Sequence, residues 1–465
     1  MSDLSALTVA EASAALTAGS ITAGELTDAY LSRIERLDSR INSYILVQHE
    51  RARAEAAAAD ARRQAGRRRG PLDGIPYAVK DNIDVASVVT SDGLGPRGKA
   101  PALSDAVAVA RLAAAGAVLL GKLNLHEGAL GATTENRHFG PTHNPWRHGF
   151  TPGGSSGGSG AAVAARLCGF ALGTDTMGSI RLPAAYCGSV GLKQSYGLVS
   201  NRGATPACDG LDHIGPLTHG VGDAALVLAA LAGHDADWPG SRLAPAGWTS
   251  LPAELPDLSG IGIGVLDNFQ RYPSEPAVVA GFEQACALLQ RLGARIERLD
   301  IPDYEPLAAR RAGLMWVEAA AAATHERDLA AYPEAFPPVI RGMLDYGRKL
   351  SAARLARAQG DIAGLGAAFR RAIAQVDVLA APAAPQLPFA FAGPQPADQA
   401  EFLAPANFSG QPALTLPCGM TRDGLPLSLQ LIGQPFGEAR LLSIARVFER
   451  AVAFNSRPPL AEFHR

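Results

Sequence analysis

The stretch "TPGGSSGGSG", residues 151–160, places serines among closely spaced glycines in a chain otherwise rich in alanine and leucine. Such a composition is typical of a flexible linker, but also of a loop whose backbone must pass close to a reactive group. The residues that follow, "AAVAARLCGFALGTDT" (161–176), predict a helix and then a buried strand. The elements around this loop therefore decide between the two interpretations.

Working outward, predicted strands and helices alternate. Upstream, "PYAVKDNIDV" (76–85) predicts a strand that carries Lys80, and residues 106–124 predict a helix, a glycine stop and a buried strand. Further strand and helix patterns follow at residues 260–269, 275–300, 376–388, 412–419 and 425–433. This alternation predicts an α/β fold in which a large mixed, mostly central β-sheet is surrounded by helices.

The whole chain, residues 1–465, is expected to form one domain. Residues 8–65 predict two helices, and Thr8 and Thr22 are expected to cap them. Residues 1–65 are accordingly treated as an N-terminal helical segment of that domain.

Composition and charge exclude several classes of function. The chain has 465 residues, of which 47% are hydrophobic, and a net charge of -2, so a nucleic-acid partner is not expected. No charge-free run of about 18 apolar residues is present, so no membrane span is expected. The five cysteines are scattered, which fits reduced thiols better than a disulfide framework. We therefore expect a cytoplasmic protein.

Two short motifs suggest a bound nucleotide or a metal ion. Residues 116–122 spell G-x-x-x-x-G-K, but Leu123 stands where a phosphate-binding loop needs a serine or threonine for Mg²⁺. His138, His143 and His148 recur every five residues, but their loop has no nearby acids to support a metal site. Neither a metal ion nor another cofactor is expected.

A third motif, G-x-S-x-G around Ser155, is the nucleophile turn of α/β-hydrolases. That turn must follow a strand, whereas the preceding "HNPWRHGFTP" (143–152) is polar and contains two prolines. No aspartate and histidine follow in a recognisable context. We therefore do not assign Ser155 as this kind of nucleophile.

The combination of motifs is far more specific than any single one. "GGSSGGSG" (153–160) is followed by "LGTDTMGSIRLPAAYCGSVGLKQSYG" (172–197), and "GIPYAVKDN" (74–82) lies upstream. Together they resemble the amidase signature family, serine hydrolases of carboxamides. The resemblance extends to "TTENRHFGPTHNPW" (133–146), "DVLAAPAAP" (377–385) and "ANFSGQPALTLPCGMTRDGLPLSLQLIGQPF" (406–436). It is weakest over residues 235–370, the most variable stretch, which we expect to line the substrate pocket.

The resemblance implies a catalytic triad. Ser179 would be the nucleophile, Ser155 a relay on a cis peptide after Gly154, and Lys80 the base. A lysine is a base only when neutral, which requires burial to lower its pKa from about 10.4. The alternative is a lysine paired with Asp81 in solvent. If the triad assignment holds, the glycines allow the loop to pack against Ser179 and Lys80, and the segment is not a linker.

The resemblance also implies an oxyanion hole and supporting residues. The backbone N–H groups expected to hold the oxyanion are those of Thr176, Met177, Gly178 and Ser179. Asp175 and Arg181 are expected to hold this loop by a buried ion pair, and Ser156 to support it by hydrogen bonding. The side chain of Met177 is expected to point into the pocket, with core filling as the alternative.

Two functions remain open. The first is a stand-alone amidase that hydrolyses a small carboxamide or urea-like C–N bond through an acyl-serine. The second is the glutaminase subunit of the glutamyl-tRNA amidotransferase, which frees ammonia from glutamine for a partner-bound tRNA. That subunit usually has an acid where this chain has Ala400, with Glu401 shifted by one, and a glycine where it has Met177. These departures favour the stand-alone amidase.

The sequence says little about the substrate itself. Arg341 and Arg348 lie seven apart on a predicted helix and could bind a substrate carboxylate, although solvated arginines are commoner. The only partner expected is a small-molecule amide substrate. Whether the protein forms a homodimer is left open.

Overall fold

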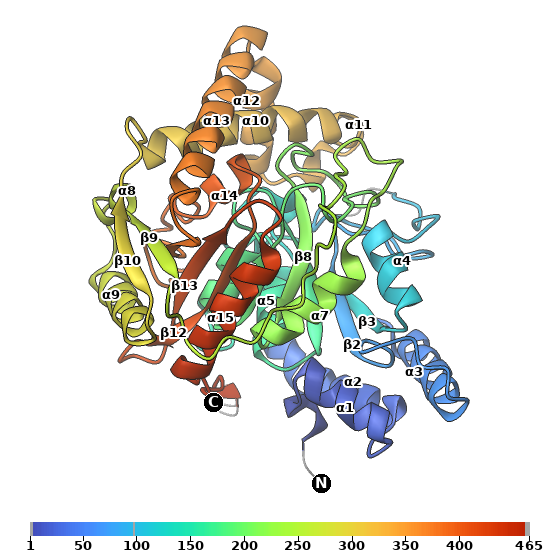
Figure 1. Cartoon of the computed structure of the whole chain (residues 1–465). Coiled ribbons are helices and arrows are strands. Elements are labelled where there is room, and N and C mark those ends of the chain that lie inside the picture. The colour runs from blue at the N-terminus through green and yellow to red at the C-terminus, as the bar shows by residue number, and fades with distance from the viewer. Residues whose placement is uncertain (1–2, 96–97, 461–465) are drawn as a thin grey trace.

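The computed structural model describes residues 3–95 and 98–460 and is built around one large β-sheet (Figure 1). Within these ranges the sheet has eleven strands, in the order β1 (Tyr44–Val47), β3 (Val118–Leu123), β2 (Pro76–Lys80), β6 (Phe170–Asp175), β8 (His213–Thr218), β7 (Val190–Lys193), β12 (Ala413–Met420), β13 (Pro426–Gly433), β11 (Val378–Pro382), β9 (Gly262–Leu266) and β10 (Arg295–Leu299). Parallel pairs join β2 to β3 and β6, and β9 to β10 and β11, whereas the other neighbours are antiparallel. The predicted mixed sheet is therefore confirmed.

Helices cover both faces of the sheet. They are α1 (Val9–Ala18), α2 (Ala23–Ile41), α3 (His49–Gln64), α4 (Val107–Ala114), α5 (Gly157–Ala164), α6 (Arg181–Cys187), α7 (Val221–Leu231), α8 (Asp267–Gln270), α9 (Pro276–Arg291), α10 (Pro306–Thr324), α11 (Glu326–Ala331), α12 (Pro338–Lys349), α13 (Ala352–Ile373), α14 (Ala404–Phe408) and α15 (Glu438–Val452). α7 and α15 pack together on one face, and α5 and α6 on the other. α10, α12 and α13 form a separate helical layer at the top of Figure 1. A two-stranded ribbon of β4 (Glu135–Asn136) and β5 (Gly140–Pro141) lies outside the sheet.

The N-terminal segment differs from the prediction of two helices over residues 8–65. Thr8 and Thr22 do cap α1 and α2, each through a capping box with the glutamate three residues later. The chain then forms an edge strand, β1, before α3 begins. Three of the residues 44–47, "YILV", are aromatic or β-branched, and the segment pairs antiparallel with β3. This long-range pairing is not visible in the helical pattern on either side.

Parallel strands bring the predicted site residues together. β2 and β6 are neighbours and run in the same direction, so Lys80 at the end of β2 lies near the end of β6 at Asp175. The loop after β6 carries Ser179 and leads into α6. Ser155 lies just before α5, which packs on β2 and β6. All three residues therefore lie close to the carboxyl ends of β2 and β6.

The glycine-rich loop is part of the packed core and is not a linker. Residues 151–163 are all buried. A Cβ added at Gly158 would lie 2.4 Å from the carbonyl oxygen of Asn124, and Gly153 has a φ of 84°. Gly158 therefore allows the backbone of Asn124 to approach closely. Gly153 adopts the left-handed conformation that favours glycine.

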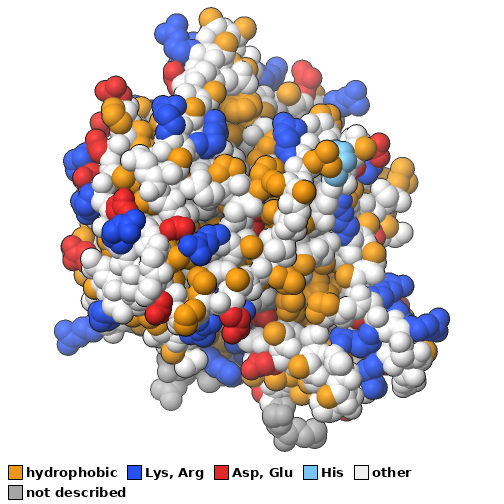
Figure 2. Space-filling model, in the orientation of Figure 1, with side chains coloured by type: hydrophobic (Ala, Val, Ile, Leu, Met, Phe, Trp, Pro, Cys, Tyr) orange, Lys and Arg blue, Asp and Glu red, His pale blue; other side chains and the backbone are white. Residues whose placement is uncertain are grey.

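The surface carries mixed charge. Figure 2 shows basic and acidic side chains interspersed over most of the visible face, which agrees with the small net charge. Among the described residues, no helix is both long and apolar enough to cross a membrane.

Candidate active site

Lys80 is completely buried at the end of β2. Its Nζ lies 2.7 Å from Ser155 Oγ and 2.7 Å from Thr174 Oγ1. The neighbouring Asp81 faces a different lysine, because its carboxylate lies 2.9 Å from Nζ of the buried Lys122. The alternative of a solvated pair between Lys80 and Asp81 is therefore wrong. Lys122, from the G-x-x-x-x-G-K motif, is a buried strand residue.

Burial lowers the pKa of Lys80 from its usual 10.5 to about 7. The carboxylates of Asp212, Asp175 and Asp92 act in the opposite direction, but their effect is smaller than that of burial. A substantial share of Lys80 is consequently neutral near pH 7. This is the protonation state in which its nitrogen can accept a proton.

The two serines are held side by side by their backbones. The Gly154–Ser155 peptide is cis. The N–H of Ser156 donates to the carbonyl oxygen of Ser179 over 3.3 Å, which joins the glycine-rich loop to the loop after β6. Ser155 Oγ is hydrogen bonded to Lys80, whereas the Ser179 hydroxyl makes no hydrogen bond to any residue that the structure describes. Ser179 lies in the wall of a pocket.

The predicted oxyanion loop is a tight turn built around Asp175. The N–H of Gly178 donates to Asp175 Oδ1 over 2.8 Å, so this donor is already engaged. The N–H groups of Thr176, Met177 and Ser179 have no acceptor among the described residues. The Thr176 hydroxyl donates to Asp212 over 2.5 Å. Burial raises the pKa of Asp212 to about 6, although the Thr176 hydroxyl and two backbone N–H groups oppose this.

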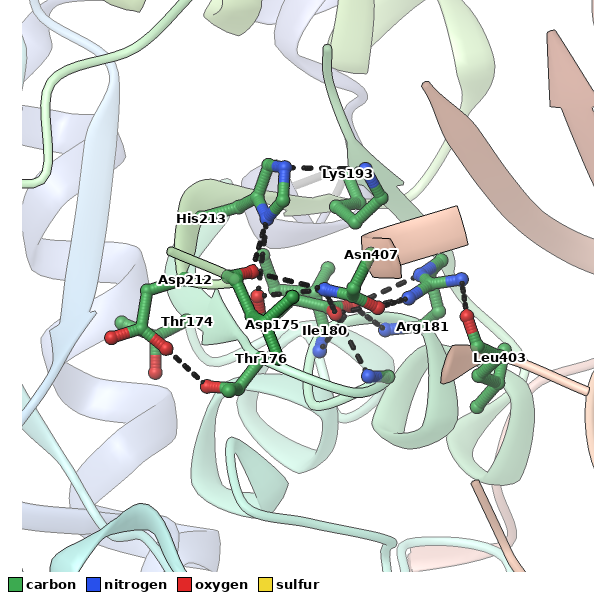
Figure 3. Close-up of polar contacts among 12 residues, drawn as sticks. Thr174, Asp175, Thr176, Ile180, Arg181, Lys193, Asp212, His213, Leu403 and Asn407 are labelled. Atoms are coloured by element: carbon green, nitrogen blue, oxygen red, sulfur yellow. Dashed lines mark hydrogen bonds and ion pairs between the residues drawn. The ribbon is translucent and has the colours of Figure 1, made fainter. Parts of the chain in front are cut away.

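The predicted pair of Asp175 and Arg181 lies beneath this turn, and both side chains are fully buried (Figure 3). Arg181 binds the carboxylate through Nη2 and Nε, each over 3.0 Å. Its remaining donors reach the Leu403 carbonyl, Gln430 Oε1 and Asn407 Oδ1. Burial alone would raise the pKa of Asp175, but Arg181 and Asn407 hold it below its usual value. The charge pair is therefore fully hydrogen bonded, as a buried pair must be.

The pocket beside Ser179 has a volume of about 390 Å³. Its wall includes Gly154 and the residues of the oxyanion loop, together with residues from α10 and α12, namely Arg310, Leu314, Val317, Val339 and Met343. These helices belong to the stretch 235–370. Met177 also lines the pocket, and its Cε would be 3.0 Å from a Cβ added at Gly313 of α10. The methionine thus reaches across the pocket wall toward α10.

Several candidate residues lie outside this site. Arg341 and Arg348 are exposed on α12 and do not line the pocket, and Arg348 pairs with Asp345 at 3.7 Å. His143 and His148 stack on each other, with ring centroids 3.9 Å apart. Over residues 3–95 and 98–460 no group of histidine, cysteine and acidic side chains is placed to hold a metal ion.

Sequence reasoning missed several residues of the site. Thr174 contacts Lys80, Asn407 and Gln430 contact Arg181, and Arg310 lines the pocket. Asn407 and Gln430 lie within a stretch that resembles the amidase signature family, but their chemistry gave no sign of their role. Arg310 lies in the least recognisable stretch, so no signal pointed to it.

Comparisons with known proteins identify the family of this chain. The family model "Amidase" matches residues 25–442. The chain is 39% identical to a glutamyl-tRNA(Gln) amidotransferase subunit of Chloroflexus aurantiacus, over 99% of both chains. It is similar to a solved structure from work on a vestigial protein complex and the origins of an s-triazine catabolic enzyme (TM-score 0.89, 36% identity, 96% of this chain and 98% of the other).

The native peptide amidase of Stenotrophomonas maltophilia is a further structural relative, with a TM-score of 0.85 and 33% identity. The alignment covers 98% of this chain and 99% of that one. The family model and these relatives span nearly the whole chain, and the residues that the family model matches include those of the site. The chain therefore belongs to the amidase family, as an amidase signature hydrolase that acts on amide C–N bonds.

Proposed function

We propose that this protein is a stand-alone amidase that hydrolyses a small carboxamide or urea-like C–N bond through an acyl-enzyme on Ser179. The observation that carries the proposal is the buried Lys80, whose pKa is lowered to about 7 and whose Nζ lies 2.7 Å from Ser155 Oγ. A neutral amine in contact with a hydroxyl is a means of activating a serine without histidine.

In the first step Ser179 Oγ attacks the amide carbon. A C–O bond forms, and the carbonyl π electrons move onto the oxygen. The Ser179 proton passes to Ser155 Oγ while the Ser155 proton passes to Lys80 Nζ, which becomes an ammonium group. The Ser179 hydroxyl has no hydrogen-bond partner among the described residues, so it must turn toward Ser155 when substrate binds. Catalytic hydrogen bonds of this kind often form fully only in the complex with substrate.

The tetrahedral intermediate then collapses. The C–N bond breaks, and the leaving nitrogen receives a proton returned from Lys80 through Ser155, so Lys80 is neutral again. Water repeats the sequence on the acyl-serine: it loses a proton to the same relay, and Ser179 regains one as the acid is released. The N–H groups of Thr176, Met177 and Ser179 are the predicted donors that remain available for the oxyanion in both halves of the reaction.

The alternative is the glutaminase subunit of a tRNA-dependent amidotransferase. It is favoured by the 39% identity to such subunits. Against it, the pocket wall carries Ala400 where those subunits usually have an acid, and the neighbouring Glu401 does not line the pocket. Met177 also fills space that a glycine would leave open.

A labelling experiment tests the nucleophile. A fluorophosphonate probe should modify Ser179, and peptide mass mapping should locate the label there. Ser179→Ala should abolish labelling. Ser189→Ala is a matched control, since that buried hydroxyl has no partner in the described structure. Label on Ser155 with Ser179 unmodified would contradict the assignment.

An activity screen separates the two functions. The purified chain alone should hydrolyse at least one small carboxamide or urea-like compound with a higher kcat/KM than glutamine. If glutamine is the best substrate and activity depends on partner proteins that copurify, the alternative is correct.

A further inference from the structure

The wall of the pocket contains a positively charged side chain, Arg310, that is held in place by a buried carboxylate. Arg310 lines the pocket from α10, and its side chain is 13% exposed. Its Nε donates to Glu401 Oε1 over 2.8 Å, and the Glu401 side chain is completely buried. The two terminal nitrogens of Arg310 make no hydrogen bond to the residues that the structure describes. They are thus available to a ligand.

The helix geometry explains why this arginine faces the pocket. Arg310, Leu314 and Val317 are spaced four and three residues apart, so they lie on one face of α10, and all three line the pocket. The next residue, Arg311, is exposed on another face. On the side away from the pocket, Glu401 Oε1 holds the Arg310 side chain, and the Tyr272 hydroxyl lies 3.4 Å from the same oxygen. Burial raises the pKa of Glu401, but Arg310 opposes this shift.

A second polar side chain shares this part of the wall. Gln399 is 5% exposed, lines the pocket and has no hydrogen-bond partner within the described ranges. Most of the remaining wall is apolar, and Arg310 is the only formally charged side chain among the described lining residues apart from the titratable His126. Burial lowers the pKa of His126 and thereby favours its neutral form, although Glu127 and Glu135 oppose this. An apolar pocket with few placed polar groups is typical of a site that selects its ligand by those groups.

We infer that Arg310 is a specificity-determining residue that binds an oxygen acceptor at the non-reacting end of the amide substrate. Because Glu401 occupies Nε, the two terminal nitrogens present parallel N–H donors, which suit both oxygens of a carboxylate or the single oxygen of a carboxamide. Gln399 can donate to the first and either donate to or accept from the second. The inference rests on the proposed amidase function, since it names the class of amide that the site takes.

The test uses three series of linear amides matched in length, ending in methyl, carboxamide or carboxylate. For the wild type, kcat/KM should be highest for an acceptor-ended series. Arg310→Met should lower kcat/KM for that series about 10- to 100-fold, mainly through KM, because a charge-assisted hydrogen bond is lost. The methyl-ended series should change less than about twofold. The exposed Arg311→Met is the matched control and should change no series.

Comparison of the two acceptor-ended series identifies the ligand. A preference for carboxylates means that the charge of Arg310 is used, and a preference for carboxamides means that only its donors are used. An equal loss in all three series, or no loss in the acceptor-ended ones, would overturn the inference. Since Arg310→Met leaves Glu401 buried without its partner, the variant Arg310→Met/Glu401→Gln is measured alongside it.

Binding separates this inference from the proposed function. In a Ser179→Ala background, calorimetry measures affinity for the same amides without turnover, and Arg310→Met should weaken acceptor-ended ligands by the same 10- to 100-fold. If the wild type hydrolyses no amide but this binding difference is present, the proposed function fails and the role of Arg310 stands. If methyl-ended amides are hydrolysed and Arg310→Met changes neither binding nor kcat/KM, the reverse holds.

Discussion

Replacing Lys80 by methionine should change both activity and the pH dependence of stability. The folded-state pKa of about 7 means that activity of the wild type falls on the acidic side about tenfold per pH unit, because only neutral Lys80 accepts a proton. At pH 5 the rate should be about one hundredth of its plateau. Lys80→Met should remove nearly all turnover and with it this acidic limb, as measured by kcat across pH.

The stability effect follows from the same shift. The pKa of Lys80 is 10.5 in the unfolded chain and about 7 in the folded one, a difference of 10.5 − 7 = 3.5 units. This corresponds to a penalty of about 5 kcal/mol. The unfolded state binds more protons between pH 7 and 10.5, so stability rises with pH across that window. The penalty is fully present below pH 7 and disappears as pH approaches 10.5.

The assay is the difference in unfolding free energy between the wild type and Lys80→Met, from urea titrations at pH 7 and pH 9. Taking the difference cancels the titration of all other groups. It should shift in favour of the wild type by about 2 kcal/mol over these two pH units. Lys349→Met, at an exposed position on α12, is the control for the loss of a lysine. A pH-independent difference for Lys80→Met, or a shift of opposite sign, would refute a lysine made neutral by burial.

Further predictions concern the rest of the site. Ser179→Ala should lower kcat at least about 10³-fold, and Ser179→Ala/Lys80→Met should be scarcely worse, because the residues act as a unit; additive losses in steady-state kinetics would argue against a shared relay. Met177→Gly should extend activity toward amides with bulkier acyl groups while keeping kcat for small ones, and a uniform loss of stability with unchanged selectivity would mean that the side chain only fills space. Arg181→Met should lower the free energy of unfolding by about 3–5 kcal/mol in urea titrations, since it leaves the Asp175 carboxylate buried without its cation. EDTA should leave activity unchanged, and a loss that Zn²⁺ restores would show that a metal site was overlooked.

The sequence by itself determined the features that depend on local chemistry. The capping boxes at Thr8 and Thr22 are local hydrogen bonds, so the residues that make them can be read directly. The mixed sheet could be predicted from the alternation of strand and helix patterns along the chain. The family could be predicted from a set of motifs in a fixed order. The pair of Asp175 and Arg181 followed from the resemblance, because both residues lie within one continuous motif of the family.

Only the tertiary structure decided the features that depend on distant residues. β1 is a strand because β3 lies beside it, and not because of its neighbours in sequence. Lys80 has a lowered pKa because the surrounding fold buries it, although Asp81, its neighbour in sequence, could have kept it charged. Two hydrogen-bond donors of the Arg181 guanidinium find their acceptors on Asn407 and Gln430, which are more than 200 residues away in sequence.

The packing of distant elements also decides which arginines line the pocket. Arg341 and Arg348 had the spacing of one helical face, but spacing does not tell which way that face points, and both are exposed. Arg310 lies in the pocket because α10 packs against the loop that carries Glu401, a contact between residues 91 apart. Periodicity defines faces within an element, whereas the packing of elements determines which face meets the substrate.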